Sequence, residues 1–101
     1  MIGTYILDGH TPVPCEDTVT WGHWFKKAKR HVALDEVDGH RVSTVFLGID
    51  HSFSGGTPIL FETMVFRGYS SSDLACERCS TWEQAEAQHA AMVARVRRGE
   101  L

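Results

Sequence analysis

The sequence has no long apolar run, no large excess of one charge and only three cysteines. A membrane-spanning helix needs about 20 consecutive apolar residues, so we expect no membrane segment, and no signal peptide is recognisable. The formal net charge of −3 gives no general nucleic-acid-binding footprint. Because an odd number of cysteines argues against a closed disulfide framework, a reducing cytoplasm is the expected compartment.

Two motifs are present only in part. Cys76 and Cys79 form a single C-x-x-C, whereas a zinc site needs four ligands and a thioredoxin-like site belongs at a βαβ unit that the chain lacks. The glycine-rich stretch 52–56 lacks the Lys-Ser/Thr ending of a phosphate-binding loop. We therefore expect no metal and no cofactor, and interpret this stretch as a flexible recognition loop.

The strongest pattern lies in residues 42–66, where two apolar runs flank a segment of Ser, Gly and Pro. This arrangement is typical of a β-hairpin. Side chains alternate between the two faces of a strand, and in residues 42–49 and 58–66 both faces are largely apolar. Such strands are normally covered on both sides. Glu62 is the exception, a carboxylate within an apolar run.

Two amphipathic helices are expected. The first runs from about 18 to 31 after Asp17 as N-cap, and its tryptophans recur at helical spacing. The second runs roughly from 81 to 98, after a capping-box pattern at 80–83. His89 lies on its apolar face.

The remaining segments read as strands at 4–7, 32–38 and 74–79, with Asp38-Gly39 as the turn into the central hairpin. The order β-α-β-β-β-(β)-α predicts an α+β fold. It is a single domain over residues 1–101, an antiparallel sheet of three to five strands with the two helices packed on one face.

The second face of that sheet then needs a cover. We assign to it five apolar side chains of the hairpin, Val42, Phe46, Leu60, Met64 and Phe66, and take the last four as the candidate dimer or partner face. Monomers seldom expose a large apolar patch, so a homodimer joined sheet to sheet, or a docked partner, is expected to cover this face. The alternative is that strand twist and the N-terminal segment cover part of it.

Asp50 and His51 lie at the mouth of the hairpin loop, with Glu62 on the returning strand. Such groups form a metal site or an acid–base pair where they converge. The alternative, which we favour, is that Glu62 pairs with an arginine or tryptophan and that His89 is a core residue bonded to a carbonyl or carboxylate. No catalytic residue is assigned. The candidate ligand- or partner-binding residues are Asp50, His51, Phe53, Gly55, Gly56, Glu62 and His89.

A basic cluster occupies the C-terminal half of the first helix: Lys26, Lys27, Lys29 and Arg30. Basic residues beside aromatic ones suit nucleic-acid contacts. Helical spacing, however, puts Trp21 and Trp24 on the opposite face. We therefore interpret the cluster as a solvated surface, and nucleic-acid binding is the third reading.

The central stretch 42–51, followed by Phe53, Gly55-Gly56, Pro58 and residues 60–64, resembles a family of small uncharacterised proteins of tailed phages and prophages. The opening residues 5–9 and the stretch 80–86 with His89 are similar to that family as well. The resemblance implies a phage origin and action in the cytoplasm of a bacterial host, and it carries no secure activity.

Two functions from different classes follow. The first is a non-enzymatic binding protein that inhibits a host or anti-phage defence protein, or sequesters a small nucleotide signal. The second is a small metal-dependent hydrolase. We favour the first, because no two groups lie so close in sequence that a catalytic geometry is forced.

Overall fold

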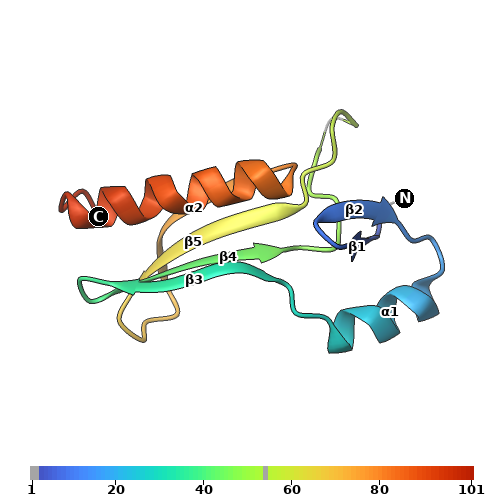
Figure 1. The fold of residues 1–101 in the computed structure, drawn as a ribbon, viewed down its shortest axis with the longest axis horizontal. Coiled ribbons are helices and arrows are strands. Elements are labelled where there is room, and N and C mark those ends of the chain that lie inside the picture. The colour runs from blue at the N-terminus through green and yellow to red at the C-terminus, as the bar shows by residue number, and fades with distance from the viewer. Residues whose placement is uncertain (1–2, 54) are drawn as a thin grey trace.

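The computed structural model describes residues 3–53 and 55–101 and shows two antiparallel sheets and two helices (Figure 1). The elements in chain order are β1 (Tyr5–Asp8), β2 (Thr11–Pro14), α1 (Thr18–Lys27), β3 (His31–Val37), β4 (His40–Phe46), β5 (Phe61–Arg67), β6 (Asp73–Cys79) and α2 (Trp82–Arg97). β1 and β2 form a small hairpin, and β3 to β6 form a four-stranded meander in sequential order. The α+β class with an antiparallel sheet is confirmed.

The meander forms where the turn chemistry and the alternation of apolar residues agree. Asp38 and Gly39 both have positive φ, as the tight turn from β3 into β4 requires. β4 pairs with β5 so that Val42 is opposite Val65 and Phe46 is opposite Phe61. This register decides which residues of the two strands share a face.

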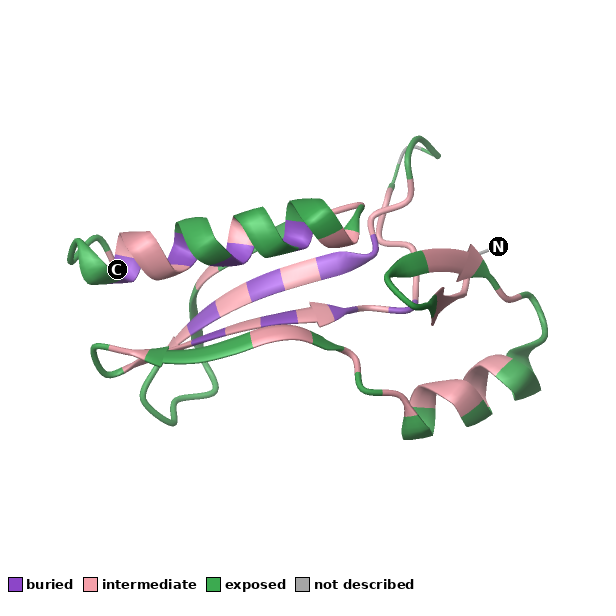
Figure 2. Cartoon of the chain, in the orientation of Figure 1, coloured by how far each residue is buried: buried purple, intermediate pink, exposed green. Residues whose placement is uncertain are grey.

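α2 packs across one face of the meander and contacts all four strands (Figure 1). The face beneath it is buried, as the alternating stripes along β4 and β5 show (Figure 2). The buried apolar residues are Val42, Phe46, Leu60, Phe61, Val65, Ala85, Met92 and Val96. Burial of each large side chain among them contributes about 1.5–3 kcal/mol relative to exposure.

The small hairpin and α1 pack at the end of the meander near Phe46. Trp24 of α1 meets the Phe46 ring edge-on, and the indole N–H of Trp21 donates to the carbonyls of Tyr5 and Gly48. Gly48 has a φ of +75°, and a Cβ there would lie 3.2 Å from the ring of Phe25. Glycine is therefore required at this close approach.

Several expectations need correction. α1 does not lie on the sheet beside α2, and it ends at Lys27 rather than His31. It ends early because the Arg30 carbonyl already accepts from the amide of Phe46. The capping box of α2 is formed by Thr81 and Gln84, one residue later than expected.

The assignment of faces in the central hairpin was wrong for three residues. Val42, Phe46 and Leu60 are buried, with exposed fractions of 0%, 0% and 3%, so they cannot form a docking face. The register places Phe46 with Phe61 beneath α2, whereas Met64 and Phe66 are opposite Ser43 and Arg41 on the other face. Alternation along each strand could not reveal this, because it does not specify how two strands are aligned.

No helix among the described residues is long and apolar enough to span a membrane.

Candidate functional site: the open face of the sheet

The loop between β4 and β5 is organised by Asp50. Its carboxylate accepts from the amide and hydroxyl of Ser52 and from the amide of Ile59, at 2.8–3.0 Å. These bonds, the Ser52 amide first, hold the pKa of Asp50 below its usual value. Because they occupy both carboxylate oxygens, Asp50 serves to close the loop.

The other loop candidates lie away from Asp50's contacts. The amide of His51 donates to the carbonyl of Ile59, and Phe53, Gly55 and Gly56 are exposed, with Phe53 fully so. Ser54 lies outside the described residues. The loop projects from the end of the meander beside the small hairpin (Figure 1). Its tip is accessible, and the described polar contacts of Asp50 and His51 are made within the loop and to Gly3.

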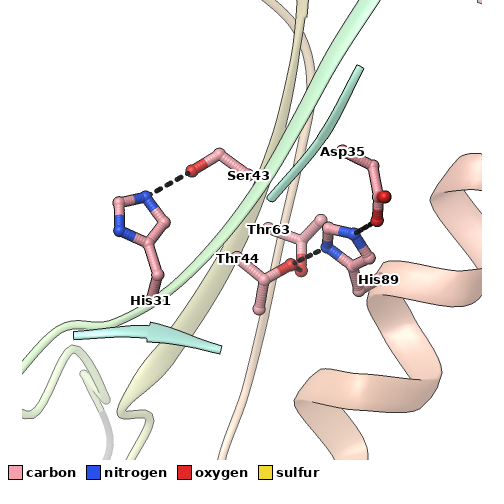
Figure 3. Close-up of polar contacts among 6 residues, drawn as sticks. All are labelled: His31, Asp35, Ser43, Thr44, Thr63 and His89. Carbon is pink, nitrogen blue, oxygen red and sulfur yellow. Dashed lines mark hydrogen bonds and ion pairs between the residues drawn. The ribbon is translucent and has the colours of Figure 1, made fainter. Parts of the chain in front are cut away.

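His89 links α2 to the sheet through a chain of polar contacts (Figure 3). Its Nδ1 is 2.7 Å from the hydroxyl of Thr44, which is 2.7 Å from that of Thr63, and its Nε2 is 2.7 Å from the Asp35 carboxylate. A single direction of donation, from Thr63 through Thr44 and a neutral His89 to Asp35, satisfies every atom in the chain. His89 is therefore a core residue paired with a carboxylate, as the favoured reading expected.

This Asp–His–Thr arrangement resembles a hydrolytic triad in its contacts but not in its access. Thr44 has an exposed fraction of 0%, so its hydroxyl cannot reach a substrate carbonyl. Its oxygen is already bonded to Thr63 as well as to His89. The geometry favours a structural role for this cluster.

Glu62 lies on the face opposite α2. Its carboxylate pairs with Arg78 at 2.9 Å and is 3.6 Å from the thiol of Cys76. The expected pairing with an arginine is thus present. Glu62 and His89 are on opposite faces of the sheet, so the proposed metal or acid–base group does not converge. Among the described residues no group of three His, Cys, Asp or Glu is placed to hold a metal.

The two cysteines of the C-x-x-C are on opposite faces of β6. Cys76 is opposite Met64, and Cys79 is opposite Phe61, which is buried beneath α2. Burial, and for Cys76 then the neighbouring Glu62, raises the pKa of each thiol. Neither shared metal binding nor thiolate chemistry fits this placement.

The basic cluster of α1 is smaller in the structure than in the sequence. The guanidinium of Arg30 stacks over Phe25 and donates to the carbonyl of Phe46, so it is engaged within the fold. Lys26, Lys27 and Lys29 are exposed. Three lysines on a chain of net charge −3 are weak support for a nucleic-acid interface.

The remaining candidate is the open face of the sheet, the side away from α2. Of the described elements only α2 packs across the meander, so nothing described covers this side. The register places on this side a set of residues from all four strands that includes Leu34, Glu36, Arg41, Ser43, Val45, Glu62, Met64, Phe66, Cys76 and Arg78. Leu34 is 54% exposed.

Three of its charged side chains have partners within the face. Glu62 pairs with Arg78, and the guanidinium of Arg41 lies over the ring of Phe66. A partner therefore meets a half-buried apolar centre of Val45, Met64 and Phe66, with the Glu62–Arg78 ion pair beside it. Sequence reasoning found Met64 and Phe66 but missed Val45 and Arg41. No local signal identified Val45, because only the pairing of β4 with β5 places it on the same face as Met64.

Comparisons of the chain with protein-family models, with curated proteins and with solved structures find no match.

Proposed function

We propose that this protein is a non-enzymatic binding protein that docks a partner protein on the open face of its sheet. The proposal depends on one observation, that a helix covers only one of the two faces of the meander. α2 buries one face, while the opposite face presents Val45, Met64 and Phe66 without a covering element among the described residues. An apolar patch bordered by charged residues is typical of a protein-interaction surface.

The polar clusters support binding rather than catalysis. Asp50 is occupied by the backbone of its own loop, and the His89 cluster lacks access to solvent at Thr44. The acid–base geometry that a hydrolase needs is missing from both. A small nucleotide is a weaker fit to the open face than a protein, because Arg78 is already paired with Glu62 and the Arg41 guanidinium lies over the Phe66 ring.

The resemblance to a phage family suggests the class of partner. A phage protein of this size acting in a bacterial host would bind and inhibit a host or anti-phage defence protein. The apolar centre of the open face suits such a target, because the cores of protein interfaces are depleted in charged residues. The charged residues Glu62 and Arg78 beside it form an ion pair with each other.

Affinity capture from bacterial cells tests this proposal with three variants. Met64→Lys and Val45→Lys place a cation at the apolar centre, where docking would leave it desolvated and unpaired. Val19→Lys, at a 67% exposed position on α1, is the matched control. We expect the wild type and Val19→Lys to retain the same protein, and both open-face variants to lose it.

Circular dichroism and thermal unfolding establish that each variant is folded. Retention of the same protein by Met64→Lys and Val45→Lys would show that the open face is not the docking surface. A wild type that retains nothing specific from infected or uninfected cells would also contradict the proposal.

A further inference from the structure

A second surface lies on the flank of α2 above β3. There a groove of about 540 Å³ is lined by Asp35, His89, Ala90, Val93, Ala94, Arg97 and Arg98. Ala90 and Ala94 are one helical turn apart on the same side of α2, and their short side chains leave the groove shallow at its centre. Short side chains at the centre permit another helix to approach closely.

The two ends of this flank carry opposite charges. Glu86 is one turn before Ala90, and Arg97 is about three turns after Glu86, so both point from the same side of α2. Neither Glu86 nor Arg97 takes part in an ion pair among the residues that the structure describes. The other arginines of the last turns are paired, Arg95 with Glu77 and Arg98 with Glu100.

The opposite flank of α2 differs in this respect. There Gln88 donates from its side-chain amide to the carbonyl of Glu77 in β6 at 2.7 Å, and Arg95 is also directed to Glu77. That flank is therefore bonded to its own sheet. On the β3 side the polar contact of α2 to its own sheet is the His89–Asp35 pair, in which Asp35 is half exposed, and the charged ends remain available.

We propose that the flank of α2 above β3 binds a second copy of this chain, with the two α2 helices antiparallel about a two-fold axis. A symmetric contact requires one surface to complement itself. An axis midway along the flank brings Glu86 opposite Arg97 of the second copy, and Ala90 opposite its Val93. The symmetry produces the Glu86–Arg97 pair twice, with the small residues between.

The expected interface is of modest size. The 16 residues of α2 extend about 24 Å, so the contact is at the small end for stable dimers. The dimer should therefore dissociate on dilution, and it should weaken in high salt because its ion pairs are at the surface. This dimer differs from the sheet-to-sheet dimer expected from the sequence, because both open faces stay free.

Sedimentation velocity over a range of protein concentrations tests the proposal. We expect the wild type to move from monomer to dimer as the concentration rises. Glu86→Arg and Arg97→Glu should each raise the dissociation constant by about tenfold or more, because each puts like charges opposite one another twice. The double variant E86R/R97E restores both pairs and should dimerise as the wild type does.

Arg95→Glu on the other flank of the same helix is the control, and it should leave the dimer intact. Each substituted side chain is at the surface, so circular dichroism should show the wild-type fold. A wild type that is monomeric at every concentration would overturn the proposal. Loss of the dimer in Met64→Lys, with no effect of Glu86→Arg, would overturn it in favour of the open face. Failure of E86R/R97E to rescue would likewise sink the antiparallel pairing.

Discussion

At the residue scale, His89 is the side chain that joins α2 to two strands of the sheet through polar contacts. It joins Asp35 of β3 and Thr44 of β4 to α2, and it has an exposed fraction of 5%. We expect His89→Ala to lower the free energy of unfolding by about 2–4 kcal/mol, because it leaves a cavity and removes the acceptor of the buried Thr44 hydroxyl. Urea unfolding measures this loss, and His89→Gln should restore part of it. An unchanged midpoint in His89→Ala would contradict a structural role.

Asp50 leads to a prediction about acid stability. Its pKa is lowered from 3.8 in the folded chain by the Ser52 and Ile59 amides, so the unfolded chain binds a proton more readily. Its stabilising contribution is complete above pH 3.8 and is lost as the pH falls towards the lowered pKa. Asp50→Asn should therefore flatten the pH dependence of urea unfolding in this acidic window. If the free energy of unfolding falls equally steeply with pH in the wild type and in Asp50→Asn, Asp50 does not contribute to acid stability.

At the element scale, β6 separates the two cysteines of the C-x-x-C. Residues three apart on a strand are on opposite faces, so Cys76 and Cys79 cannot form a disulfide without distortion of β6. Mild oxidation of the folded protein should yield no Cys76–Cys79 bond, and mass spectrometry of a digest checks this. Oxidation after unfolding in urea is the control, in which the bond is free to form. Formation of the bond in the folded state would mean that β6 ends before Cys79.

At the scale of the whole molecule, the two proposed surfaces are compatible. The chain measures 43 × 28 × 24 Å, and the open face and the flank of α2 lie on different sides of the meander. If two α2 helices pack side by side above their sheets, the two-fold axis is perpendicular to the sheets and both open faces point the same way. The dimer would then present two docking faces together, and a partner with two copies of its own would be bound with avidity.

The sequence by itself determined the elements of this protein and its class. The Asp38-Gly39 turn, the Asp17 cap, the periodicity of α2 and the alternation in β4 and β5 are local signals, and the elements that they predict are present. β2 was not predicted as a strand, and α1 ends earlier than its pattern suggested. The position of His89 on the apolar face of α2 also followed from spacing alone.

Only the tertiary structure decided which apolar face is covered and which residues meet. β4 and β5 are apolar on both sides, so alternation left open whether Phe46 pairs with Phe61 or lies with Met64. The alignment of the two strands settled it. For the same reason Glu62 and His89, both plausible ligands in sequence, lie on opposite sides of one sheet. Long-range alignment depends on loop closure and packing together, and no short stretch of sequence specifies it.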